Sequence, residues 1–151
     1  MTTLISHRGN LTGKQPSFEN NPDYVHKAMM EDYDVEVDAW FKDDKWWLGH
    51  DEPKYETTLN FLCQPRMWVH CKNIEALSVL RNYHTDVHYF WHQEDDYTLT
   101  SRGYIWAYPG KPAALGNHTI CVLPELNNQD VKSFYGICSD IIKDYDERNK
   151  L

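Results

Sequence analysis

The chain has 151 residues, of which 41% are hydrophobic and 25% are charged. This length and composition predict one globular domain, spanning residues 1–151, with a sizeable core. The 15 basic and 23 acidic residues give a net charge of −8. A surface this acidic argues against nucleic acid as a partner. Since the sequence contains no long apolar run, we also expect no stable membrane insertion.

The compartment is predicted from the start of the chain and from its cysteines. The first predicted strand begins at residue 3, which leaves no room for a cleaved signal peptide, so we expect a cytoplasmic protein. The four cysteines form no C-x-x-C pair and have apolar neighbours, which favours free buried thiols over a zinc site. The oligomeric state is left undefined by the sequence.

Short runs rich in β-branched and aromatic residues alternate with amphipathic runs along the chain. Seven runs are predicted strands, at 3–6, 35–40, 67–71, 87–91, 104–108, 119–123 and 136–142. Helices are predicted after Asn21, with Pro22 at the first helical position, after Asn73, and over 127–135. This alternation predicts parallel pairing and an α/β fold. Because a (β/α) TIM-type barrel usually needs at least about 200 residues, we expect a compact or truncated one.

Polar side chains gather where the first two predicted strands end. His7 and Arg8 follow the first strand, and Glu36 and Asp38 alternate along the second, which places both carboxylates on one face. Two carboxylates aimed together repel each other unless a cation lies between them, and a hard divalent ion is the simplest such cation. The alternative is an acidic strand face exposed to solvent.

The next segment brings a second histidine back towards this end. Asp43 and Asp44 indicate a turn, and the strand that returns from it ends at His50 and Asp51. Asp51 is placed to orient His50. Two histidines beside a metal provide a general acid and a general base with pKa values near neutrality.

The third strand, at 67–71, ends in a further pair of polar residues. His70 and Lys72 alternate to the same face. His70 is a candidate third metal ligand, and Lys72 is a candidate fixed positive charge for a phosphate. The alternative for Lys72 is an ordinary surface lysine that flanks a helix.

The order of these motifs resembles the glycerophosphodiester phosphodiesterase family. The sequence has HRG at 7–9, EN at 19–20, EVD at 36–38 and HD at 50–51, in the order of the family signature and at similar spacing. VHCK at 69–72 and GICSD at 136–140 resemble the family's third and closing strands. The chain is much shorter than typical members and lacks their substrate-capping insertion.

The resemblance implies a (β/α) barrel that binds one divalent cation, Mg²⁺ or Ca²⁺, and cleaves a small phosphodiester substrate. It implies that His7 and His50 exchange protons, that Arg8 binds the phosphate, and that Glu36 and Asp38 bind the metal. The nucleophile in the family is the substrate's own neighbouring hydroxyl, and water then opens the cyclic phosphate.

One ligand position departs from the family. His70 stands where the family has a carboxylate ligand, and imidazole also suits softer ions such as Mn²⁺ or Zn²⁺. Glu19 and Asp51 are expected to support the catalytic and ligand residues from behind. Two other readings stay open: a non-catalytic phosphate- or metal-binding module derived from this fold, and an unrelated metal-dependent phosphoesterase. Because both His7 and His50 are kept beside the carboxylate pair, we expect an enzyme, a phosphoric diester hydrolase.

Overall fold

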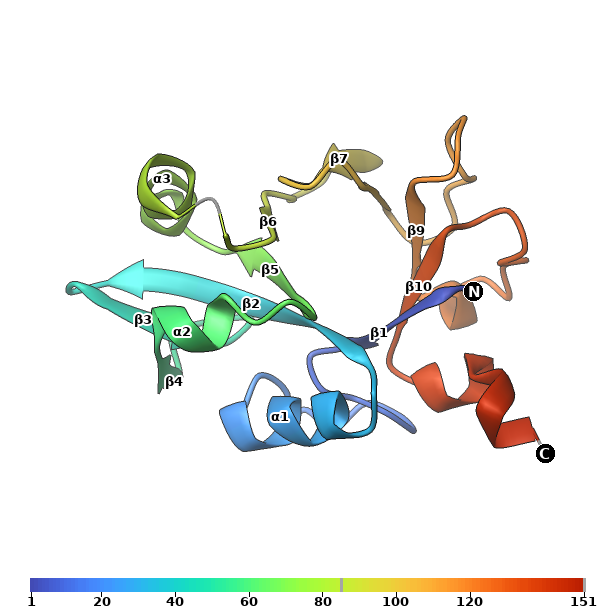
Figure 1. Cartoon of the computed structure of the whole chain (residues 1–151), viewed down its shortest axis with the longest axis horizontal. Helices are drawn as coiled ribbons and strands as arrows, with labels where there is room; N and C mark the ends of the chain where they lie inside the picture. Colours follow the sequence, from blue (N-terminus) through green and yellow to red (C-terminus); the bar gives the residue numbers. More distant parts are fainter. Residues whose placement is uncertain (85, 151) are drawn as a thin grey trace.

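A computed structural model describes residues 1–84 and 86–150. The described residues contain ten strands and three α-helices (Figure 1). The strands are β1 (Thr3–His7), β2 (Asp34–Lys42), β3 (Lys45–Leu48), β4 (Tyr55–Thr57), β5 (Met67–Cys71), β6 (Tyr89–Phe90), β7 (Tyr97–Leu99), β8 (Ile105–Ala107), β9 (Thr119–Val122) and β10 (Gly136–Ser139). The helices are α1 (Pro22–Met30), α2 (Leu59–Leu62) and α3 (Ile74–Tyr83), and the 3₁₀ turns are η1 (Pro124–Leu126), η2 (Ile142–Tyr145) and η3 (Glu147–Lys150).

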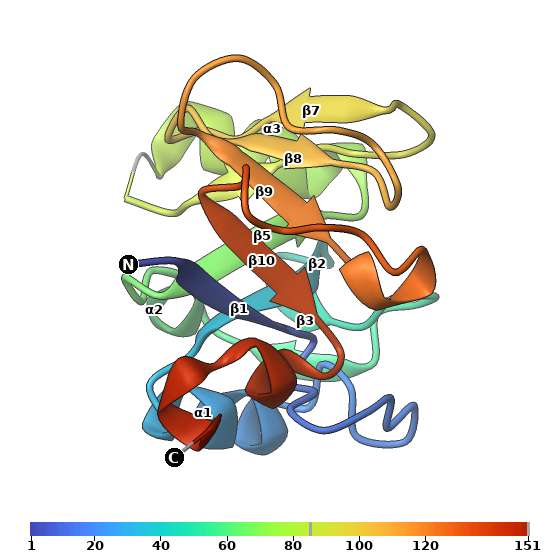
Figure 2. The same cartoon turned by 90° about the vertical axis from the view of Figure 1, so that its right-hand side faces the viewer.

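All ten strands belong to one mixed sheet. Parallel pairing joins neighbours in the order β8, β9, β10, β1, β2, β5 and β6. Antiparallel pairs extend the sheet at both ends. The C-terminal half of β2 pairs with β3, which pairs with β4, and β7 pairs with β8. The sheet curls into half a barrel, with β1, β9 and β10 side by side on the flank drawn in Figure 2.

The prediction of a TIM-type (β/α) barrel is wrong. In such a barrel a helix follows each parallel strand, whereas only three α-helices occur among the described residues. The connection from β6 to β8 is built around the antiparallel strand β7, and 108–118 joins β8 to β9 as a loop. That loop contains Pro109, Gly110, Pro112 and Gly116, which disfavour a helix. Strand content therefore dominates, and the sheet is only partly closed.

The helix predicted over 127–135 is also wrong, because this segment forms turns. Asn128 has a left-handed backbone with a φ of 48°, which a right-handed helix does not allow. Phe134 instead packs with Ala107 and Cys121, and Val131 lies against them. A loop with two apolar anchors thus takes the place of a covering helix.

Alternation along the strands sorts side chains between the two faces of the sheet. On the outer face, Val35, Val37 and Val69 form one core with residues of α1 and α3. On the inner face, Trp68 and Trp106 form a second core with their neighbours Ile5, Phe90, Ile120, Val122 and Cys138. Because side chains alternate, Glu36, Asp38 and His70 project to the inner face. The half-barrel therefore directs its polar strand residues inward.

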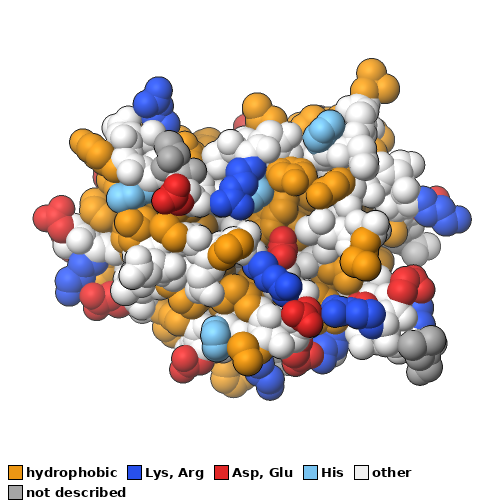
Figure 3. Space-filling view, in the orientation of Figure 1, with side chains coloured by type: hydrophobic (Ala, Val, Ile, Leu, Met, Phe, Trp, Pro, Cys, Tyr) orange, Lys and Arg blue, Asp and Glu red, His pale blue; other side chains and the backbone are white. Residues whose placement is uncertain are grey.

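The surface carries charges of both signs. On the face drawn in Figure 3, acidic, basic and hydrophobic side chains are interspersed. Across residues 1–84 and 86–150, no helix combines the length and the apolar character that a membrane span requires.

Candidate functional site

Strand register brings the polar residues of the first three parallel strands together. His7, the last residue of β1, lies opposite Glu36 of β2, and Asp38 lies opposite His70 of β5. The Nε2 atom of His7 is 3.5 Å from Glu36 Oε2. Both carboxylates are buried, with Glu36 2% exposed and Asp38 1% exposed. The acidic residues of β2 therefore do not form a solvent-exposed strand face.

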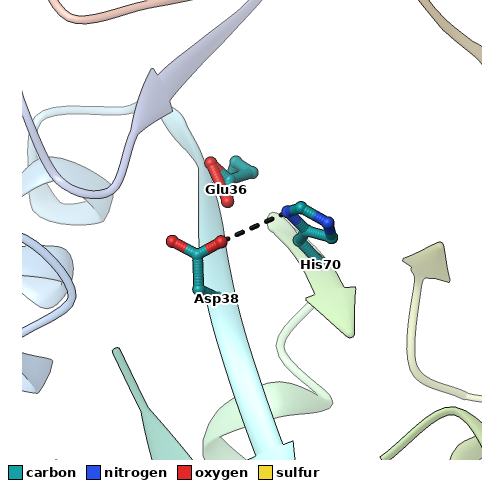
Figure 4. Close-up of side chains that lie close together, drawn as sticks. All are labelled: Glu36, Asp38 and His70. Atoms are coloured by element: carbon teal, nitrogen blue, oxygen red, sulfur yellow. Dashed lines mark ion pairs between the residues drawn. The ribbon is translucent and has the colours of Figure 1, made fainter. Parts of the chain in front are cut away.

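Glu36, Asp38 and His70 have the arrangement of a metal site. Each offers one ligand atom, and the three atoms lie within 4.8 Å of one another (Figure 4). Glu36 Oε1 and Asp38 Oδ1 are buried and form no hydrogen bond among the described residues, and the nearest cationic-capable atom to Asp38 Oδ1 is His70 Nδ1 at 3.2 Å. Burying a carboxylate oxygen without a partner is costly, and a cation between the three residues removes that cost. The residues therefore fit the divalent cation that the sequence predicts.

The hydrogen bonding of His70 also suits a metal ligand. Its Nε2 lies 2.8 Å from the backbone carbonyl oxygen of His92, which only accepts, so Nε2 carries a proton and donates it. The other nitrogen, Nδ1, lies 3.2 Å from Asp38 Oδ1. With a cation, the same nitrogen offers a lone pair, and the His92 carbonyl fixes the ring from behind.

The two buried carboxylates differ in their protonation. Burial raises the pKa of Glu36, and the negative charge of Asp38 raises it further. Burial also acts to raise the pKa of Asp38, but contacts with His70 and Arg8 outweigh it and hold that pKa below its ordinary value. In the absence of a cation, Glu36 is thus the carboxylate that takes up a proton more readily.

Arg8 is held in place by the acidic residues around it. Its Nε is 3.1 Å from Asp38 Oδ2, and its Nη1 is 3.2 Å from Glu19 Oε1. Asn20 donates to Asp38 Oδ2 and accepts from the Asp38 backbone N–H. Arg8 and Asn20 both have left-handed backbones, with φ of 58° and 67°. Such strain is common where a fold positions functional side chains. The Glu19-Asn20 pair thereby ties the loop after β1 to β2.

The structure adds a residue that the sequence reasoning missed. Asp140 follows β10, and its Oδ1 lies 2.7 Å from His7 Nδ1 and accepts a hydrogen bond from Asn10. The Asp140 backbone N–H donates to Glu125. Because a carboxylate holds His7 Nδ1–H, the ring presents Nε2 to the interior of the site, on the side of Glu36. Asp140 lies at the end of a parallel strand, the signal already used for Glu36 and Asp38.

Charge at His7 follows from these neighbours. Burial alone lowers the pKa of His7, but the hydrogen bond to Asp140 and the charge of Glu36 together outweigh it. The pKa of His7 is therefore raised, which favours the imidazolium form. Burial acts to raise the pKa of Asp140, whereas its hydrogen bond to His7 lowers it, and the net shift is downward.

His50 and Asp51 lie just beyond β3, on a more open side of the site. His50 Nδ1 is 2.6 Å from Asp51 Oδ1, so these adjacent residues do contact each other. The side chain of His50 is 46% exposed and that of Asp51 is 92% exposed. Gly49 precedes them with a φ of 152°, and a Cβ there would lie 2.1 Å from the Glu52 carbonyl oxygen. This turn therefore needs glycine to present His50.

Two cavities open at the site and share four of their lining residues. The larger has a volume of about 650 Å³ and also contains Lys72, His70 and Glu36. The smaller has a volume of about 410 Å³ and also contains Glu19, Asn20, Asp51 and Asp140. The shared residues are His7, Arg8, His50 and Leu123. The predicted acid–base histidines thus lie where the cavities meet.

Comparison with known proteins identifies no relative for this chain. No family model, no curated protein and no solved structure matches it.

Proposed function

We propose that this protein is a metal-dependent phosphodiesterase, similar to the glycerophosphodiester phosphodiesterases, that cleaves a small phosphodiester by acid–base catalysis with His7 and His50. The observation that carries the proposal is that both histidines and Arg8 line both cavities. A phosphodiester has two alcohol arms, so its phosphorus needs room on two sides. A reaction centre between two cavities suits a diester better than a monoester.

In this proposal His7 is the general acid. Its raised pKa favours the protonated form, and Asp140 directs the Nε2 proton into the site. His50 is the general base, with Asp51 holding its Nδ1. A new bond forms between phosphorus and the nucleophilic oxygen, whose proton passes to His50. The bond from phosphorus to the leaving oxygen breaks, and that oxygen takes the proton of His7. The nucleophile is a hydroxyl of the substrate next to the phosphate, and water then opens the cyclic product.

Charge on the phosphoryl oxygens is balanced by cationic groups of the site. Arg8 lies beside both cavities and Lys72 lines the larger one. A divalent cation held by Glu36, Asp38 and His70 would supply Lewis-acid stabilisation of that charge. Mg²⁺ and Ca²⁺ suit the two carboxylates, whereas Mn²⁺ and Zn²⁺ also suit the imidazole of His70.

We also propose that the enzyme works in the cytoplasm. All four cysteines are free, and three of them are buried, which suits a compartment that keeps thiols reduced.

The test is hydrolysis of glycerophosphodiesters and of an aryl phosphodiester, with chelator and with each of Mg²⁺, Ca²⁺, Mn²⁺ and Zn²⁺ added back. We expect metal-dependent turnover with a bell-shaped pH profile, and losses of about 10²-fold or more in His7→Ala and His50→Ala. His26→Ala is the matched control, because His26 is exposed on α1, outside both cavities. If no diester is cleaved with any of the four ions while the metal still binds, the protein is a phosphate- or metal-binding module.

A further inference from the structure

The two long walls of the larger cavity differ in chemistry. One wall comes from β1, β2, β5 and the residues that follow β6, and it carries the polar groups described above. The other wall comes from β8 and β9 and the turns after them. It is apolar, and it consists of Trp106, Tyr108, Pro109, Val122, Leu123 and Leu126.

This apolar wall is buried at its base and exposed at its rim. Trp106 is 4% exposed, and its ring lies 4.7 Å from the ring of Phe90 in the inner core. Tyr108 and Leu126, in contrast, are 48% and 58% exposed. The wall therefore offers apolar area that is still in contact with water beside a charged reaction centre. Covering such area is the main favourable term when an apolar group binds.

Leu123 shows that the wall is built at a conformational cost. Its backbone is left-handed, with φ 47° and ψ 54°, a conformation that residues with a Cβ rarely adopt. The strained residue is one of the four that line both cavities, as is His7. Backbone strain of this kind persists where the surrounding structure imposes it, and it is concentrated at functional sites. An apolar side chain is thereby fixed where the two cavities meet.

The smaller cavity has no comparable apolar wall among the described residues. Its lining includes the charged side chains Lys14, Glu19, Asp51, Glu52 and Lys54, and its apolar side chains among the described residues are Pro16 and the shared Leu123. The polar wall of the larger cavity carries both Lys72 and Glu94, so it does not select a charged group of one sign. The two sides of the reaction centre therefore differ in the kind of alcohol that they accept.

We propose that the substrate is an asymmetric phosphodiester, with an uncharged apolar ester arm against Trp106, Tyr108, Leu123 and Leu126, and a polar, hydroxyl-bearing arm in the smaller cavity. This inference rests on the proposed function, because it assigns the two arms of the diester that His7 and His50 cleave. Good substrates would then differ from poor ones in the apolar area of one ester arm.

The test separates binding from turnover. Methyl alkylphosphonates carry one negative charge, like a phosphodiester, and resist cleavage at the carbon–phosphorus bond. Calorimetric titration of the protein with the methyl to hexyl members, at constant Mn²⁺, should show affinity rising about threefold to fourfold for each methylene that becomes buried. In parallel, kcat/KM is measured for glycerol phosphodiesters with alcohols from methanol to hexanol, and it should rise with the same dependence on chain length.

Variants locate the apolar arm. Tyr108→Ser and Leu126→Ser should weaken binding of the hexyl ligand several-fold and change binding of the methyl ligand less than twofold. Leu123→Asn should do the same, because asparagine tolerates the left-handed backbone but provides no apolar branch. Leu115→Ser is the matched control, since Leu115 is fully exposed and lines neither cavity. Circular dichroism checks that each variant is folded.

The possible results separate the proposal of an apolar arm from the proposal that the protein is a phosphodiesterase. Affinity that does not depend on chain length in the wild type overturns the apolar arm, even when diesters are cleaved. A choline ester that binds better than its neutral 3,3-dimethylbutyl isostere overturns it as well, because the arm would then be recognised by its charge. Chain-length-dependent binding without any turnover supports the apolar wall and overturns only the hydrolase.

Discussion

Replacing Asp140 with asparagine removes the carboxylate that His7 Nδ1 contacts at 2.7 Å, and keeps a side chain of the same shape. Hydrogen bonds to charged groups contribute about 1.5–3 kcal/mol, whereas neutral ones contribute about 0.5–1.5 kcal/mol. The difference, about 1–1.5 kcal/mol, is the stabilisation of the His7 imidazolium that the substitution removes. The His7 side chain is only 12% exposed, so solvent screens little of this effect. We therefore expect the pKa of His7 to fall in Asp140→Asn, because its protonated form loses the hydrogen bond to a carboxylate.

The same change should alter stability in a pH-dependent way. The folded pKa of His7 is raised above 6.5, so its contribution is complete below 6.5 and is lost as the pH rises through the folded pKa. The folded pKa of Asp140 is lowered below 3.8, so its contribution is present above 3.8 and is lost as the pH falls through the folded pKa. The pair therefore stabilises the protein most between these two values, and Asp140→Asn should cost more at about pH 5.5 than at about pH 9.

The assay is an NMR titration of the imidazole nitrogens, with urea unfolding at the two pH values. Asp44→Asn is the control, because it makes the same charge change in the exposed turn between β2 and β3, where an asparagine suits the φ of 58°. A His7 pKa that is unchanged in Asp140→Asn, or that falls equally in Asp44→Asn, would refute the assignment of Asp140 as the residue that holds His7.

Two further predictions concern the metal site and the turn before His50. Glu36→Gln and Asp38→Asn should each weaken Mn²⁺ binding in calorimetric titration, and unchanged affinity in both variants would exclude these carboxylates as ligands. His70→Glu should shift the metal preference towards Mg²⁺ or Ca²⁺, because all three ligands would then be oxygen donors. Gly49→Ala should lower the free energy of unfolding by about 1–3 kcal/mol and reduce turnover, because its Cβ would lie 2.1 Å from the Glu52 oxygen at a φ of 152°. Gly103→Ala is the control, because Gly103 has a positive φ but no atom within 4 Å of where a Cβ would lie. If Gly103→Ala loses as much unfolding free energy as Gly49→Ala, backbone strain alone explains the effect.

Local patterns predicted the strands better than the connections between them. The strand at 67–71 has the predicted bounds, because Met67–Cys71 is an uninterrupted apolar run apart from His70. Asn21 and Asn73 cap helices as predicted, since each accepts a hydrogen bond from a backbone N–H of the first turn. The segment 127–135 was misread because its spacing of apolar residues fits a helix, although its asparagines favour turns. The barrel prediction failed because the spacing of the predicted strands indicates how they pair, but it does not show whether a helix or a loop connects them over the outer face.

The candidate site was predictable where its residues were close in sequence. Alternation in β2 placed Glu36 and Asp38 on one face, and the register with β5 brings His70 to them. Asp140 was missed because its contact with His7 depends on which strand pairs with β1, and a single sequence does not give strand order. The His92 carbonyl was missed because backbone acceptors have no signal in the side-chain pattern.

The pairing of β1 with β10 determines when the site can exist during synthesis. Asp140 lies 133 positions after His7, so His7 leaves the ribosome well before it. Until β10 has been translated, β1 lacks its neighbour on that side and His7 lacks its carboxylate. Contacts of such long sequence separation form slowly, because a large loop must close first. The nascent chain therefore exposes an unpaired edge of β1 until β10 has been translated, and during that period this edge is open to chaperones and to aggregation.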